Sequence, residues 1–264
     1  MTTVDYMSPR VRLIANVATI SGRNLHRLVR VPTLIAFATV QPILFVVLFN
    51  YTWGGAVHPP GVDRYIDYVL PGIFVLSIAF GASQTGVAVA DDLATGMIGR
   101  FRALPMARSA VLAGRCAADA IRNLFVVGLM IGVGTLIGFR FHAGPGAAIA
   151  AVGLAVAIGL AFSWIFALLG LFVRDPEAAG IGGLLAVIPL IFVSSTFVPV
   201  ATMPGWLQTF ADINPITITV DALRALCLGG PTATHVWQAL AWIGVLLVVT
   251  IPAATLRYRQ TTAT

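Results

Sequence analysis

Residues 68–115 read "YVLPGIFVLSIAFGASQTGVAVADDLATGMIGRFRALPMARSAVLAGR", a long apolar run followed by a segment with four arginines. The apolar run is long enough to cross the hydrocarbon of a membrane, which takes about 20 residues of helix. The arginines that follow it suit the cytoplasmic side, where loops carry an excess of positive charge. This stretch therefore predicts a membrane-spanning helix and also its orientation.

The composition of the whole chain also indicates an integral membrane protein. Of its 264 residues, 58% are hydrophobic and 10% are charged, and the mean hydropathy is +0.93. Soluble domains are only about 45–50% apolar. The 16 basic residues are all arginines. Because they flank apolar runs and do not share a solvated face with aromatic side chains, we expect no nucleic-acid binding.

The sequence contains no lysine. A phosphate-binding loop of the GxxxxGK type needs a lysine to reach the terminal phosphates. We therefore expect that this chain binds no cofactor, does not hydrolyse ATP by itself and is not an enzyme. The four histidines are dispersed, and no cluster of His and Cys predicts a metal site.

Six stretches of about 20 mostly apolar residues predict six membrane-spanning helices, and hence an all-α integral membrane protein. We place them at 33–53, 68–90, 121–139, 146–173, 178–199 and 235–256, in one six-span domain of residues 33–256. On this topology 13 of the 16 arginines fall on one side of the membrane, counting Arg122 at the start of the third span. By the positive-inside rule that side is the cytoplasm, so both termini, including the tail 257–264, are expected there.

Residues 1–32 are predicted to form a cytoplasmic N-terminus with an amphipathic helix at 12–30. In a helix its aliphatic side chains fall in one arc and its arginines on another face. Such a helix lies among the headgroups of the anionic inner leaflet, which makes membrane lipids an expected partner. A simple topology anchor is the alternative.

Residues 200–234 lie outside by topology and yet are rich in apolar side chains. Trp206, Leu207, Phe210 and Ile213 share the face of one predicted helix. A second helix is predicted to begin at Asn214-Pro215 and to stop at Gly229-Gly230. We expect both helices to re-enter the outer leaflet, either as a lid over the space between the spans or as plain interfacial packing.

The interiors of the six predicted spans are expected to carry no charged residue, which disfavours a carrier driven by an ion gradient. Uncharged polar groups do occur in the spans. Most hydroxyl groups can bond to their own helix and need no further role. The better candidates for a translocation path are Gln84, Ser194, Ser195 and Thr196. The expected cargo is accordingly amphiphilic and mostly apolar.

Three stretches carry a family resemblance: residues 68–115, "GFRFHAG" at 138–144, and "FVPVATMPGWLQTFADINPITITVDALRAL" at 197–226. Together they resemble the permease subunits of type-2 ABC exporters, and in particular the daunorubicin/doxorubicin-resistance type of actinobacteria. The resemblance implies a six-span subunit in the bacterial plasma membrane. It also implies two permease subunits, as a homodimer or a heterodimer, paired with two copies of a separate subunit that binds ATP and Mg.

The resemblance further implies that the loop after the second span, at 91–120, couples the permease to the ATP-binding subunit. Its entrance is marked by Asp91 and Asp92. The implied docking surface consists of Arg100, Phe101, Arg102, Leu104, Pro105 and Arg108. The loop is less charged than the family pattern at Ala94, Thr95 and Gly99. The alternative is that these arginines only orient the chain in the membrane.

Three functions remain open on the sequence. The leading interpretation is the permease subunit of an ATP-driven exporter that moves amphiphilic drugs or lipids out of the cell. A secondary, ion-coupled carrier of drugs or lipids is the first alternative. The second alternative is a membrane assembly protein that transports nothing.

Overall fold

The computed structural model describes residues 19–22, 30, 32–59, 61–95, 108–173 and 175–261. All regular secondary structure in these residues is helical, which confirms the predicted all-α class. The elements are α2 (Pro32–Trp53), α3 (Tyr65–Ala94), α5 (Arg108–Ile137), α6 (Pro145–Val173), α7 (Pro176–Phe192), a 3-10 turn η1 (Val200–Thr202), α8 (Gly205–Ile213), α9 (Pro215–Leu228) and α10 (Thr232–Thr261).

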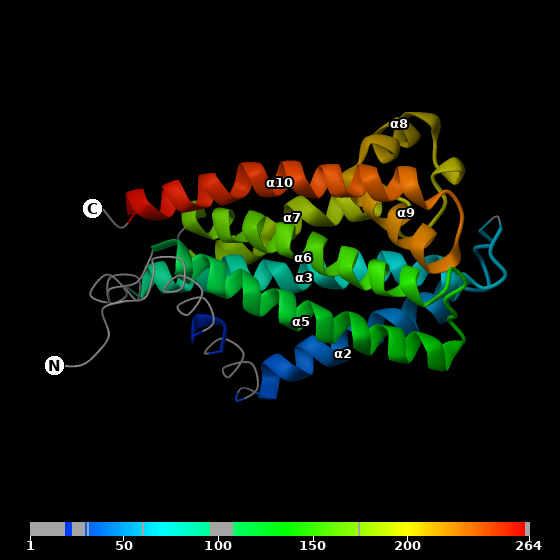
Figure 1. Cartoon of the computed structure of the whole chain (residues 1–264), viewed down its shortest axis with the longest axis horizontal. Coiled ribbons are helices and arrows are strands. Elements are labelled where there is room, and N and C mark those ends of the chain that lie inside the picture. The colour runs from blue at the N-terminus through cyan, green and yellow to red at the C-terminus, as the bar shows by residue number, and fades with distance from the viewer. Residues whose placement is uncertain are drawn as a thin grey trace.

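The long helices run side by side in one bundle with α3 at its centre (Figure 1). Helix α3 packs against α2, α5, α6, α7 and α9. As a result 72% of its apolar segment is buried, against 11% of that of α2. The short helices α8 and α9 lie at one end of the bundle, and the last turn of α10 lies at the other (Figure 1). We call these the α9 end and the terminal end.

Close approach of two glycines sets the packing of α3 on α6. A Cβ atom added to Gly170 of α6 would lie 2.3 Å from the carbonyl oxygen of Gly86 in α3. A Cβ atom added to Gly86 would lie 2.8 Å from the carbonyl oxygen of Phe166. Only glycine leaves room for two helix backbones at such distances. This crossing joins α3, the most buried of the five long apolar helices, to α6, the most apolar of them.

Five of the helices are long and apolar enough to cross a membrane: Ala36–Trp53, Tyr65–Ala94, Leu112–Ile137, Pro145–Val173 and Thr232–Gln260. They overlap the predicted spans 33–53, 68–90, 121–139, 146–173 and 235–256. The structure shows helix at both ends of the predicted loop 91–120, because α3 continues to Ala94 and α5 begins at Arg108. The position of this segment relative to the membrane stays a prediction. Two of the charged residues in these helical segments, Asp92 and Arg115, pair with each other.

The predicted span 178–199 corresponds to α7, which has only 17 residues and ends at Phe192. Its start follows from local chemistry: Asp175 caps the helix by accepting from the backbone N–H groups of Glu177 and Ala178. Its end lies just after Pro189, where the chain leaves the helix at Val193. Residues 193–199 therefore do not continue the helix, although the predicted span included them.

The two helices predicted in 200–234 are present. Asn214 caps α9 by accepting from the N–H of Ile216 at 2.9 Å, and Pro215 is its first residue. The helix ends before Gly229, which has a positive φ of 93° that favours glycine. On α8 the side chains of Trp206, Phe210 and Ile213 are exposed, as expected for a helix that contacts lipid. Whether these helices enter the membrane stays a prediction.

Most of the predicted amphipathic helix at 12–30 lies outside the described residues. Residues 19–22 are helical, and within them Ile20 is buried. The Ser21 hydroxyl donates to the carbonyl oxygen of Gly114 at 2.8 Å. This short segment is thus attached to the first half of α5.

Candidate functional site

A cavity of about 630 Å³ lies between α2, α3 and α5, beside the first half of α7. Its lining residues on α3 fall between Ser77 and Asp91, and those on α5 fall between Arg115 and Val126, so it occupies the half of the bundle nearer the terminal end. Apolar side chains such as Phe37 and Phe80 form part of the wall. The polar part of the lining consists of Gln41, Ser77, Ser83, Gln84, Thr85, Asp91, Arg115, Asp119, Arg122 and Asn123.

The charged side chains of α5 reach the cavity because of their spacing. Arg115, Asp119 and Arg122 follow one another at intervals of four and three residues, which places them on one face of a helix. That face turns toward α3. The early start of α5 at Arg108 makes this possible, because it puts all three residues in regular helix.

Two ion pairs neutralise most of this charge. Arg115 Nη2 lies 2.7 Å from Asp92 Oδ2 on α3, and Arg122 Nη1 lies 3.1 Å from Asp119 Oδ1 on the same helix. The Thr85 hydroxyl donates to the other carboxylate oxygen of Asp119. Charges of this kind are tolerated away from water only when they are paired and hydrogen-bonded.

These pairs correct the expectation that the interiors of the spans are uncharged. Arg122 is the second residue of the predicted span 121–139, and it is part of α5 together with Asp119 and Arg115. The prediction overlooked Arg122 inside its own span, and it assigned Arg115 and Asp119 to the loop 91–120. In the structure the charges belong to helices and face a shared cavity.

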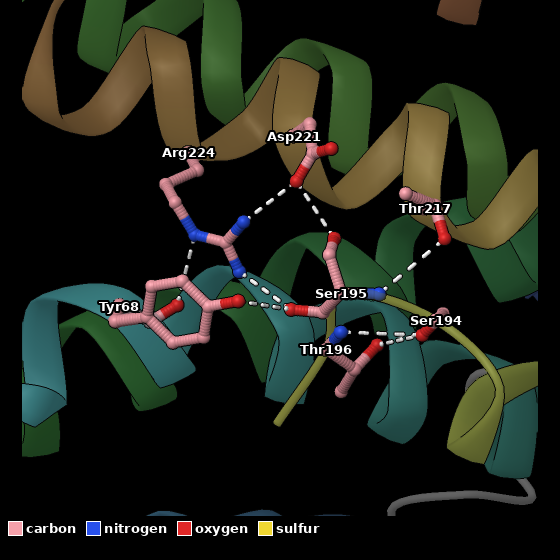
Figure 2. Close-up of polar contacts among 7 residues, drawn as sticks. All are labelled: Tyr68, Ser194, Ser195, Thr196, Thr217, Asp221 and Arg224. Carbon is pink, nitrogen blue, oxygen red and sulfur yellow. Dashed lines mark hydrogen bonds and ion pairs between the residues drawn. The ribbon is translucent and has the colours of Figure 1, made fainter. Parts of the chain in front are cut away.

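A second polar cluster lies at the α9 end. We call it the Arg224 cluster and define it by Tyr68, Ser195, Asp221 and Arg224 (Figure 2). Arg224 Nη1 lies 2.6 Å from Asp221 Oδ1, one turn earlier in α9. Its guanidinium group stands over the Tyr68 ring of α3, 3.8 Å from the ring centroid. The Ser195 hydroxyl donates to the same Asp221 oxygen at 2.7 Å.

The cluster satisfies backbone groups that the end of α7 leaves without helical partners. The Ser195 carbonyl oxygen accepts from Arg224 Nη2 at 2.9 Å and from the Tyr68 hydroxyl at 3.0 Å. Arg224 Nε also donates to the Tyr68 carbonyl oxygen at 3.2 Å. Buried carbonyl groups need such partners. One arginine therefore ties together α3, α9 and the segment that follows α7.

The four predicted translocation residues lie in two separate places. Gln84 is exposed and lines the cavity. Ser194, Ser195 and Thr196 are buried, with 1%, 3% and 0% of their surface exposed, in and beside the Arg224 cluster. The sixteen residues of α3 that separate Tyr68 from Gln84 correspond to about 24 Å of helix. A role for all four in one path stays a prediction.

Of the residues implied to couple to an ATP-binding subunit, three lie among the described residues. Asp91 lines the cavity, Asp92 is buried in its pair with Arg115, and Arg108 is the first residue of α5. The other implied docking residues, Arg100, Phe101, Arg102, Leu104 and Pro105, lie outside the described residues. Their role in docking stays a prediction.

Sequence reasoning missed the polar side chains of α5 and the Arg224 cluster. A signal for the first was present in the spacing of Arg115, Asp119 and Arg122, which is that of one helical face. For the second, Asp221 and Arg224 stand three residues apart, as ion pairs within a helix do. Nothing in the sequence showed that Tyr68, 156 residues away from Arg224, would complete that cluster.

Residues 15–228 match the family described as ABC-2 type transporter. The chain is 32% identical over 224 residues to the daunorubicin resistance ABC transporter permease protein DrrB1 of Streptomyces coeruleorubidus, with 85% of this chain and 79% of that protein covered. It is 28% identical over 224 residues to the probable doxorubicin resistance ABC transporter permease protein DrrC of Mycobacterium tuberculosis, with 84% of this chain and 80% of that protein covered.

A more distant similarity extends beyond the drug-resistance permeases. The chain is 23% identical over 205 residues to the probable multidrug ABC transporter permease YbhR of Escherichia coli, with 77% of this chain and 55% of that protein covered. All three relatives are named as permeases of ABC transporters.

Proposed function

This chain belongs to the ABC-2 type transporter family as a permease subunit, and we propose that it exports an amphiphilic drug or lipid from a bacterial cell across the plasma membrane. The names of its relatives, which refer to resistance to daunorubicin and doxorubicin, support the export of amphiphilic compounds. Permeases of this family work with an ATP-binding subunit. In our proposal that subunit hydrolyses ATP with Mg, and this chain supplies the path.

One observation carries the mechanism: the cavity and the Arg224 cluster lie at opposite ends of α3. The cavity reaches Asp91, near the terminal end of the helix, whereas the cluster includes Tyr68, near its start. A transporter that works by alternating access is open at one end and closed at the other. We assign the cavity to cargo entry from the terminal end and the Arg224 cluster to closure of the α9 end.

The proposed topology has six spans, with α7 as the fifth. Its 17 residues span about 26 Å, somewhat less than the roughly 30 Å of a bilayer core, and this difference can be met by local thinning. The terminal end is assigned to the cytoplasm because most arginines of the sequence flank that side. Helices α8 and α9 would then lie in the outer leaflet.

The proposed partners are a second permease copy or a related permease, as homodimer or heterodimer, and the ATP-binding subunit. The segment Arg100 to Arg108 of the sequence is proposed to dock on that subunit, as the family resemblance implies. Arginine and aromatic side chains such as Arg102 and Phe101 are enriched at protein interfaces.

The charge pairs of the cavity favour one other function, that of an ion-coupled carrier. Ionisable groups among spanning helices often bind a coupling proton, and Asp119 is such a group. Family membership favours ATP as the energy source.

Transport into inverted vesicles separates the two functions. The vesicles would contain this chain together with the ATP-binding protein that copurifies with it in mild detergent. Accumulation of daunorubicin that needs ATP and persists with a proton ionophore supports the export function. Accumulation that needs the proton gradient and survives ATP depletion contradicts it and supports the carrier.

A further inference from the structure

We propose that the cavity selects cargo with an uncharged, hydroxyl-rich head group, such as a glycoside, and that Gln41 and Gln84 are the specificity-determining residues. This inference rests on the proposed export function, since it names the chemistry of the cargo that enters the same cavity. The inference is drawn from the hydrogen-bonding groups of the lining and from the ion pairs that its charged side chains form.

The two glutamines offer donors and acceptors from different helices. Gln41 belongs to α2 and Gln84 to α3, and both line the cavity. Neither side chain forms a hydrogen bond with another described residue. A primary amide presents two N–H donors and one carbonyl acceptor. A hydroxyl group is itself both a donor and an acceptor, so neighbouring hydroxyls on a sugar-like ring can bond to both halves of an amide.

The charges of the lining disfavour an anionic head group, and the test below distinguishes a cationic head group from an uncharged one. Arg115 is paired with Asp92, and Arg122 with Asp119. Asp91 is the one remaining charged residue in the described lining, and it forms no ion pair with another described residue. An anionic head would be repelled by Asp91, and the positive charge of each arginine is already balanced by a carboxylate. The Asp91 carboxylate instead adds an acceptor for hydroxyl groups.

Four buried donors on residues that line the cavity have no acceptor within the described part of the chain. They are Ser77 Oγ, Arg115 Nη1, Arg122 Nη2 and Asn123 Nδ2. A buried donor without an acceptor destabilises the arrangement that contains it. Because protein atoms enclose these donors, a ligand oxygen could bond to them only if the surrounding side chains move.

The apolar part of the lining suits the apolar body of the proposed cargo. Phe37 of α2 is 71% exposed and lies at the edge of the cavity. Phe80, Val87, Val126 and Leu184 continue an apolar surface within it. Ligand sites commonly combine such walls with a few polar groups that set orientation and specificity. A hydroxyl-rich head beside the glutamines and an apolar body beside the phenylalanines would use both parts.

The test measures protection of a cysteine placed in the cavity. Ala38 lines the cavity, whereas both native cysteines are buried. The full-length Ala38→Cys variant in nanodiscs is labelled with a water-soluble maleimide. Labelling is repeated with octyl glucoside, octyl sulfate or octyltrimethylammonium at equal concentrations below micelle formation. These probes share one alkyl chain and differ in the head group.

We expect octyl glucoside to slow the labelling of Ala38→Cys about 5- to 10-fold more than either charged probe, the range expected for one or two hydrogen bonds. Adding Gln41→Leu and Gln84→Leu should remove this difference. Thr95→Cys is exposed outside the cavity and should not be protected by any probe. Ser163→Ala, which removes a buried hydroxyl away from the cavity, should leave the preference unchanged.

Equal protection by all three probes would show an unselective apolar cavity and overturn the inference, as would no protection at all. Preferential protection by octyltrimethylammonium would overturn it in favour of a cationic cargo held by Asp91. Each single glutamine variant is also measured, so that a double variant that fails to fold does not decide the result. ATP-dependent accumulation in vesicles is scored separately, so the inference can fail while the export function stands.

Discussion

The guanidinium group of Arg224 lies over the ring of Tyr68, 3.8 Å from its centroid, although the two residues are far apart in the chain. The same arginine binds the Asp221 carboxylate and the carbonyl oxygens of Tyr68 and Ser195. It therefore joins α3, α9 and the segment after α7 at the end of the bundle that we propose is closed.

Replacing Arg224 with leucine should destabilise the protein. The change leaves Asp221 without its cation and removes donors from two carbonyl groups, and loss of one partner from a buried pair typically costs about 3–5 kcal/mol. Because the pair is partly exposed, we expect the lower part of that range or less. Thermal unfolding of the purified chain measures the loss.

Arg140→Leu is the control, because Arg140 is exposed and, among the described residues, its side chain bonds only to backbone carbonyls of Thr135 and Phe139. Equal loss in both variants would contradict a special role for Arg224.

Substitution of Gly170 with alanine should disrupt the packing of α3 on α6. The added methyl group would overlap the Gly86 carbonyl, which belongs to a rigid helix backbone, and overpacking typically costs about 1–3 kcal/mol. Gly153→Ala is the matched control on α6, because a Cβ atom there meets no other atom within 4 Å. Thermal unfolding should show a lower midpoint for Gly170→Ala alone. An unchanged midpoint for Gly170→Ala would contradict the conclusion that close contact at Gly170 sets the packing of α3 on α6.

The native cysteines should resist labelling in the folded protein. Both Cys116 and Cys227 are buried. Burial also raises the pKa of Cys227, in α9, to about 12 because it disfavours the thiolate. An ordinary thiol is mostly ionised above pH 9, whereas the reactivity of Cys227 should keep rising tenfold per pH unit beyond that point. Maleimide labelling at pH 7 to 10, with and without denaturant, measures this. A rate that levels off near pH 9 would contradict the prediction.

The topology can be tested with single cysteines at two exposed positions, because the native cysteines are expected to stay unlabelled. Asp63 precedes α3 at the α9 end, and Thr95 follows it at the terminal end. In intact cells an impermeant maleimide should label Asp63→Cys but should label Thr95→Cys only after permeabilisation. The reverse pattern would invert the assignment of the cytoplasmic side.

Changes in the implied docking segment should uncouple the chain from its ATP-binding subunit. Arg102→Glu combined with Phe101→Ala should weaken copurification of that subunit, since loss of one partner of a buried charged contact costs roughly 2–5 kcal/mol. The control should change an arginine outside the docking segment. Reversing the charge of Arg115 would not serve, because it would leave Asp92 without its ion-pair partner. Arg30→Glu is preferable, as Arg30 is exposed. Loss of subunit binding in the control as well, with normal membrane insertion, would show that the segment has no specific role.

The sequence by itself determined the helices and several of their ends, because these depend on interactions within a few residues along the chain. Apolar runs of about 20 residues mark the long helices. Asp175 and Asn214 begin α7 and α9 as side-chain caps, and Gly229 ends α9 because its positive φ suits glycine. The family could also be read from the sequence, since its motifs are local stretches.

Only the tertiary structure decided which polar side chains meet. Arg115 reaches Asp92, and Arg224 reaches Tyr68, through the packing of separate helices. It also decided that Gln84 lines a cavity while Ser194 to Thr196 are buried elsewhere. Charged groups among apolar helices must find partners, and the crossing of α3 and α6 at Gly86 and Gly170 helps to set which partners come within reach. That geometry depends on how whole helices pack, and no local pattern in the chain encodes it.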